Sequence, residues 1–154
     1  MDFRLREDVE LAKIPPLLTD SLPEGITALE AYPMERKGKE LKWLSVRGVF
    51  EYDTADPEKM AAGLRELFAG EGLVITKKSK KGMGESDIRP AIHSVQFTPD
   101  TGSVIVDAVV SAQEPTLNPE HLATAARQLM PECAPDFAGF SRIEVFDKDF
   151  KVFR

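Results

Sequence analysis

Residues 95–110 read VQFTPDTGSVIVDAVV, and this stretch decides the fold class. Two β-rich runs flank Pro99-Asp100-Thr101-Gly102, four residues that are typical of a turn. The stretch therefore predicts a hairpin of two strands, one running from Ile88 to Phe97 and the other from Val104 to Val110.

Amphipathic helices are predicted on both sides of this hairpin. Upstream, Asp56-Pro57-Glu58 supplies an N-cap, a first-turn proline and an acidic residue, and an apolar stripe at helical spacing follows. Downstream, Asn118-Pro119-Glu120 repeats this pattern. With further strands over 43–52, 73–75 and 143–146, the order from residue 41 onward is β-α-β-β-β-α-β. This order predicts a two-layer α+β sandwich with helices on one face, ferredoxin-like with an added strand.

The first 38 residues have a different organisation. Short strand patterns at Phe3–Leu5 and Ile26–Tyr32 flank a helical pattern interrupted by Pro15 and Pro16. Residues 1–38 therefore predict a β-α-β half unit, and the charged stretch 35–40 is the candidate boundary. The alternatives are a separate domain over 41–154 or one continuous domain.

The composition excludes several protein classes. The chain has 154 residues, of which 42% are hydrophobic and 30% charged, as in ordinary globular proteins. No apolar run approaches the roughly 20 residues of a membrane helix, and the first residues lack a signal-peptide core. The single cysteine, Cys133, excludes an internal disulfide. We expect a cytoplasmic protein.

Several catalytic and cofactor motifs are missing. The sequence contains no phosphate-binding loop, dinucleotide fingerprint or nucleophile elbow. One cysteine and two histidines, His93 and His121, fall short of a zinc or iron–sulfur ligand set. We therefore expect no cofactor and no metal, and a non-catalytic role for the chain on its own.

The segment from Lys77 to His93 carries the strongest charge signal. The formal net charge of the chain is −6, yet the five Lys and Arg residues of this segment outnumber its two acidic residues by three, which leaves −9 elsewhere. Its cationic and glycine positions are candidates for binding a polyanion such as RNA: Lys77, Lys78, Lys80, Lys81 and Gly82. The alternative is a solvated hairpin tip whose lysines protect a strand edge.

Asp87, Arg89 and His93 are the other candidate binding residues. On a continuous strand Asp87 and Arg89 would share a face, where they would form an ion pair or Arg89 would bind a phosphate or carboxylate. His93 would join them if the strand continues past Pro90. As a group the three side chains also suggest acid/base catalysis, but no nucleophile–base pair is evident, and a lone histidine is more often structural.

Two motifs carry a resemblance to a known family. Ile75-Thr76-Lys77-Lys78-Ser79-Lys80-Lys81-Gly82 is followed by Asp87-Ile88-Arg89-Pro90, and shorter matches lie at Met1-Asp2-Phe3-Arg4-Leu5 and Leu22-Pro23-Glu24-Gly25-Ile26. The chain resembles the bacterial radical-SAM-linked domain family of unknown function. Members of that family usually carry more sequence before the first of these strands, so the resemblance implies that this chain corresponds to the later part of a member.

The resemblance implies a partner rather than a reaction. Members are fused to, or encoded beside, a radical SAM protein, often near a ribonuclease of the G/E type. It therefore implies an accessory domain that recognises RNA or positions a substrate. The alternative is a protein–protein module that docks on the radical SAM protein through a sheet edge or an apolar patch.

Overall fold

The computed structural model describes residues 4–33, 36–79 and 82–153. The chain divides into two compact units, one of residues 1–37 with residue 154 and one of residues 38–153. Each unit is described by itself below.

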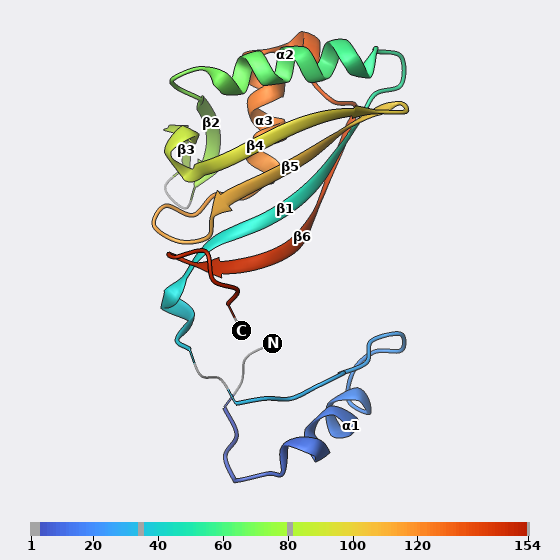
Figure 1. Ribbon diagram of the computed structural model, residues 1–154, viewed down its shortest axis with the longest axis vertical. Coiled ribbons are helices and arrows are strands. Elements are labelled where there is room, and N and C mark those ends of the chain that lie inside the picture. Colours follow the sequence, from blue (N-terminus) through green and yellow to red (C-terminus); the bar gives the residue numbers. More distant parts are fainter. Residues whose placement is uncertain (1–3, 34–35, 80–81, 154) are drawn as a thin grey trace. The chain divides into compact units, whose positions relative to one another are not determined.

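The larger unit is built on a four-stranded antiparallel sheet with the strand order β4-β5-β1-β6. Helices α2 and α3 cover one face of this sheet (Figure 1). The strands and helices of this layer pair are β1 Leu41–Glu51, α2 Pro57–Ala69, β4 Ile92–Asp100, β5 Ser103–Ser111, α3 Glu120–Leu129 and β6 Phe137–Asp147.

The predicted α+β sandwich is confirmed. The hairpin that anchors the prediction is present, because β4 pairs with β5 from Pro99↔Val104 to Ile92↔Val110. The sheet and its helices follow β-α-β-β-α-β along the chain. The more specific ferredoxin-like assignment stays a prediction.

A second, two-stranded sheet lies between α2 and β4 in the chain. Its strands are β2 Val74–Ser79 and β3 Gly82–Asp87, which pair antiparallel. The sequence predicts a strand only over 73–75 in this region, so the extension of β2 and the whole of β3 are not predicted. Because β3 contains two glycines and no buried side chain, it lacks the apolar alternation by which strands are recognised.

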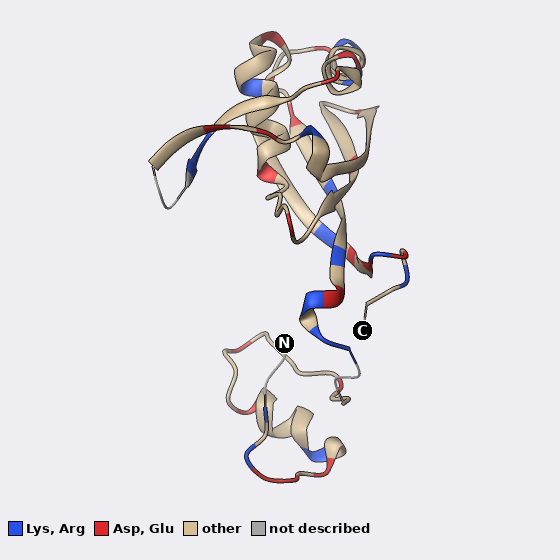
Figure 2. Ribbon diagram, turned by 90° about the vertical axis from the view of Figure 1, so that its left-hand side faces the viewer, with Lys and Arg blue, Asp and Glu red and all other residues tan. Residues whose placement is uncertain are grey.

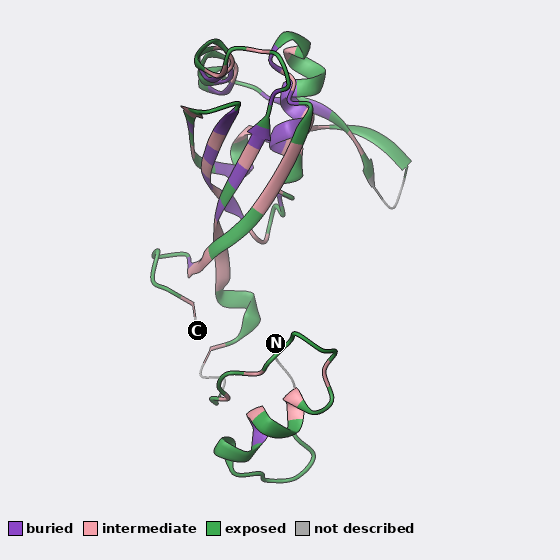
Figure 3. Ribbon diagram, turned by 90° about the vertical axis from the view of Figure 1, so that its right-hand side faces the viewer, coloured by how far each residue is buried: buried purple, intermediate pink, exposed green. Residues whose placement is uncertain are grey.

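The core lies between the four-stranded sheet and its helices (Figure 3). Phe50 of β1, Leu64 of α2, Val106 of β5 and Leu122 of α3 are fully buried there. The predicted N-cap of α2 is confirmed, because the Asp56 side chain accepts a hydrogen bond from the amide of Glu58.

Short 3₁₀ turns complete the larger unit: η2 Gly38–Glu40, η3 Arg89–Ala91 and η4 Pro131–Cys133. Cys133 is buried, and burial raises the pKa of its thiol. No helix in the described part of the chain is long and apolar enough to cross a membrane.

The smaller unit contains η1 Leu11–Lys13 and α1 Ile14–Thr19. The strand predicted over 26–32 is wrong, since these residues form no ladder, and the one predicted at Phe3–Leu5 lies partly outside the described residues. Ile14 is the one buried hydrophobic residue in the described part of this unit. Seven large apolar side chains are exposed instead: Leu5, Val9, Leu11, Leu17, Ile26, Leu29 and Tyr32.

Candidate functional site

The basic segment forms the hairpin of β2 and β3, which extends beyond the helices and the main sheet (Figures 2 and 3). Lys77 lies opposite Gly84, and Lys78 lies opposite Met83. Lys80 and Lys81 lie outside the described residues. Gly82 begins β3 with a φ of 113°, a conformation that a residue with a side chain rarely adopts.

The two described lysines of the hairpin lie on opposite faces. Ile75 is fully buried, and because side chains alternate along a strand, Lys77 shares its inward face and is half-buried. Lys78 is exposed on the other face. Neither ammonium has a carboxylate partner among the described residues. These two charges therefore remain unneutralised by the protein, but they do not converge on a common groove.

The root of the hairpin is fixed by the carboxylate of Asp87. Its Oδ1 accepts hydrogen bonds from the amide of Leu73 at 3.0 Å and from the amide of Arg89 at 2.9 Å. The amide of Ile88 also donates to the carbonyl of Leu73 at 3.0 Å. The amide of Leu73 contributes most to lowering the pKa of Asp87, followed by the amide of Arg89.

Arg89 does not share a strand face with Asp87. The strand predicted from Ile88 onward is interrupted, because Arg89 begins the 3₁₀ turn η3 and Pro90 follows within that turn. The same-face argument for an Asp87–Arg89 pair therefore fails. The guanidinium of Arg89 is half-buried, and no ion pair between it and Asp87 is present in the described part of the chain.

His93 belongs to a different neighbourhood. It is the additional residue at a register shift in β4, between Ile92 and Ser94. Its ring centroid lies 5.2 Å from that of Trp43 in β1 and 4.6 Å from that of Phe150 after β6. Among the described residues its ring contacts are thus with these two aromatics, which is a structural environment.

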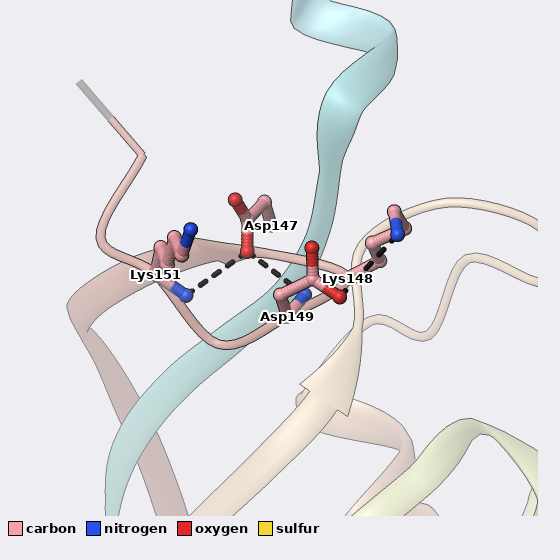
Figure 4. A network of polar contacts seen from close by, with 4 residues as sticks. All are labelled: Asp147, Lys148, Asp149 and Lys151. Carbon is pink, nitrogen blue, oxygen red and sulfur yellow. Dashed lines mark hydrogen bonds and ion pairs between the residues drawn. The ribbon is translucent and has the colours of Figure 1, made fainter.

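A polar turn follows β6, and its residues Asp147, Lys148, Asp149 and Lys151 are shown in Figure 4. Phe150 of this turn lies against Trp43, with the two rings nearly parallel and their centroids 5.6 Å apart. The buried carboxylate of Asp147 accepts hydrogen bonds from the amides of Asp149 and Lys151, both at 2.9 Å. The ammonium of Lys148 forms an ion pair with Asp149 at 3.3 Å. Trp43 is thus half-buried in an aromatic cluster at the end of the sheet.

Two residues of α3 interact with the hairpin, Gln128 through hydrogen bonds and His121 through the charge of Lys77, and neither was singled out as a site residue. The side-chain amide of Gln128 binds both backbone groups of Thr76, at 2.7 Å and 2.9 Å. Burial lowers the pKa of His121, and the charge of Lys77 lowers it further. Nothing in the local pattern of α3 signals these contacts, because they join segments about fifty residues apart.

The geometry does not assemble an acid/base centre. No hydrogen bond joins the side chains of Asp87, Arg89 and His93 in the part of the chain that the structure describes. Asp87 binds backbone amides, and His93 packs among aromatic rings. The arrangement instead leaves a protruding basic hairpin with a fixed root.

Comparison with known proteins identifies the family. The family model described as "Uncharacterized protein conserved in bacteria (DUF2344)" matches residues 1–119, which include the smaller unit, the hairpin and strands β1 to β5. No curated protein and no solved structure matches the chain. The chain therefore belongs to the uncharacterized, bacterially conserved family DUF2344.

Proposed function

We propose that the chain is a non-catalytic accessory domain of a radical SAM protein, and that its β2–β3 hairpin contacts RNA. The observation that carries the RNA part is that Lys77 and Lys78 lie on a protruding hairpin without carboxylate partners in the described structure. A protein of net charge −6 is repelled by polyanions as a whole, so a local positive arm is where contact would occur.

The mode of contact follows from the two faces of the hairpin. Since Lys78 is exposed on one face and Lys77 is half-buried on the other, the hairpin would reach RNA as an arm and not as a groove. A Cβ added at Gly84 would have no atom within 4 Å, so the hairpin has open space on that side for a phosphate. Arg89, at the hairpin root, would add a directed contact.

Fluorescence anisotropy with a labelled single-stranded RNA tests the RNA part. We expect binding that weakens steeply with salt, and a Lys77→Ala/Lys78→Ala variant whose log–log salt slope is smaller by roughly 1.4, since each phosphate contact on a single strand contributes about 0.7. The control is Lys39→Ala/Lys59→Ala, which removes the same charge from exposed positions elsewhere. No binding at low salt, or equal losses in both variants, would refute RNA contact by the hairpin.

A protein-docking role is the second candidate, favoured by a different observation. The described residues of the smaller unit expose seven large apolar side chains and bury one, Ile14. A segment of this size does not bury enough surface to form its own core, and exposed apolar groups mark interaction surfaces. In this proposal the smaller unit docks on the radical SAM protein.

Co-purification with a radical SAM protein encoded beside the gene separates the two candidates. Docking predicts a complex that survives nuclease and the Lys77→Ala/Lys78→Ala change but is lost in a Leu17→Ser/Leu29→Ser variant, whose side chains are 61% and 90% exposed. A complex that nuclease dissolves would instead indicate that RNA bridges the two proteins. Unchanged co-purification of the leucine variant would remove the smaller unit as the docking surface.

A further inference from the structure

The two edge strands of the main sheet, β4 and β6, differ in how far their outward backbone groups are covered. An exposed strand edge carries unpaired amides and carbonyls, and natural proteins usually cover it. On β4, helix α2 covers the edge, and Nε and Nη2 of Arg65 donate to the carbonyl of Phe97 at 3.0 Å and 2.6 Å. The β4 edge is therefore covered by a helix and occupied by a side chain.

Within the described residues of the larger unit, hydrogen bonds cover the β6 edge toward its end. The amide of Phe153 donates to the carbonyl of Val145 at 2.8 Å, and the amide of Val145 donates to the carboxylate of Glu144 at 3.0 Å. The chain after the strand thus folds back along its last residues, with a bridge between Phe146 and Val152. These contacts do not reach the earlier part of the edge, residues 137–143.

Residues 137–143 of β6 have no such cover. In the part of the chain that the structure describes, β6 pairs with β1 on one side only, and no hydrogen bond reaches the outer side of these seven residues. Phe137 and Ile143 mark the two ends of the stretch and are 60% and 59% exposed. Ile143 is also the additional residue at a register shift, which ends the regular part of the edge.

We infer that two copies of this chain associate by antiparallel pairing of their β6 edges, centred on Phe140. Phe137 and Ile143 each lie three residues from Phe140. In an antiparallel ladder centred there, Phe137 of one copy lies opposite Ile143 of the second copy, and the reverse pair forms at the other end. Both exposed apolar side chains thereby gain an apolar partner across the interface.

The charge on this stretch selects the same register. Arg142 is the only charged residue between 137 and 143, and pairing centred on Phe140 places it opposite Ala138. A ladder centred on Arg142 would set two guanidinium groups directly opposite each other, which destabilises a strand pair. The ladder between the two β6 strands would join the four-stranded sheets of both copies into one, and the two-fold symmetry closes the assembly at a dimer.

Sedimentation velocity over a wide range of protein concentration tests the inference. We expect a monomer–dimer equilibrium for the natural protein and loss of the dimer at every concentration in Ile143→Lys and Phe137→Lys, which place a charge on the edge. Leu129→Lys is the matched control: its position on α3 is 41% exposed and outside the interface, so it retains the dimer.

Hydrogen exchange of the unaltered protein supplies a second readout that does not depend on variants. Dilution from dimer to monomer speeds exchange within residues 137–143 and leaves β5 unchanged. A natural protein that is monomeric at all concentrations overturns the inference and leaves a strand of a different protein as the occupant of the edge. A dimer whose exchange at 137–143 is insensitive to dilution overturns it as well, because the contact then lies elsewhere.

Discussion

The side chain of Gln128 pairs with Thr76 as a neighbouring strand would. Its Oε1 accepts from the amide of Thr76 at 2.7 Å, and its Nε2 donates to the carbonyl of the same residue at 2.9 Å. One residue of α3 thus occupies both backbone groups that β2 presents on its outer side at this position. The root of the hairpin is thereby tied to helix α3.

Replacing Gln128 with alanine tests this anchor. We expect Gln128→Ala to speed hydrogen exchange across β2 and to lower the free energy of unfolding by about 0.5–1.5 kcal/mol, the usual range for lost hydrogen bonds, with the exposure of both residues favouring the lower end. Gln96→Ala, at an exposed position of β4, is the control and leaves exchange in β2 unchanged. Equal exchange in the two variants would contradict the anchoring role.

Position 48 must be a glycine because the ring of Phe140, which lies opposite it on β6, occupies the space that a side chain would need. A Cβ at Gly48 would lie 2.7 Å from Cδ1 of the Phe140 ring, closer than carbon atoms approach without a shift. We expect Gly48→Ala to lower the free energy of unfolding in urea by about 1–3 kcal/mol, as overpacking does. Adding Phe140→Leu should restore part of this loss.

Gly72→Ala provides the matched control for that series. A Cβ at Gly72 would have no atom within 4 Å, so the added methyl group meets no neighbour. Its urea midpoint should stay close to that of the natural protein. If Gly48→Ala is equally harmless, the contact between Phe140 and Gly48 does not constrain the sheet.

Asp87 should make the stability of the protein depend on pH in the acidic range. Hydrogen bonds from backbone amides, of which that of Leu73 contributes most, lower the pKa of Asp87 in the folded state below the ordinary value of about 3.9 for aspartate. A carboxyl whose pKa is lowered on folding stabilises the folded state above its unfolded pKa, and this contribution is lost as the pH falls through the lowered value.

Urea midpoints measured from neutral pH to the acid limit check this expectation. Asp87→Asn should be less stable than the natural protein at neutral pH, and the difference should vanish as Asp87 becomes protonated. Asp53→Asn, which changes an exposed aspartate whose carboxylate caps no amide in the described structure, serves as the control. A stability difference for Asp87→Asn that does not change with pH would refute the electrostatic role of the carboxylate.

The division of the chain into two domains stays a prediction that proteolysis can test. Lys37 and Lys39 are exposed near the boundary between the two units. We expect trypsin to cut there early and to leave a stable fragment that begins at residue 38 or 40, whereas Arg47, within β1, stays uncut. Simultaneous loss of both units without this fragment would indicate one continuous domain.

The sequence predicts the main sheet and its helices well, because the signals that specify them are local. Alternating apolar residues and the turn at 101–102 specify β4 and β5, and Asp56 begins α2 by accepting a hydrogen bond from a residue two positions away. The strand β3 escapes prediction because its glycines and exposed polar side chains show no period. Its position is set by pairing with β2.

The candidate site is harder to predict because it depends on contacts between distant segments. The basic hairpin is recognisable from charge alone, yet nothing in the local pattern indicates that Asp87 binds backbone amides or that His93 packs against Trp43 and Phe150. The expected grouping of Asp87, Arg89 and His93 assumes one continuous strand. The 3₁₀ turn at 89–91 breaks that assumption.

The amino-acid sequence by itself determined where the strands and helices of the main sheet lie and where positive charge concentrates, because hydrophobic period, turn residues and helix caps act over a few positions. Only the tertiary structure decided which backbone groups of the strands are covered. Gln128 of α3 binds backbone groups of β2, and Arg65 of α2 binds a carbonyl of β4. In the described part of the chain, the outer side of residues 137–143 of β6 is left without such a partner. Such cover joins segments far apart in the chain, and a hydrogen bond between them forms only when packing of the core brings donor and acceptor within reach.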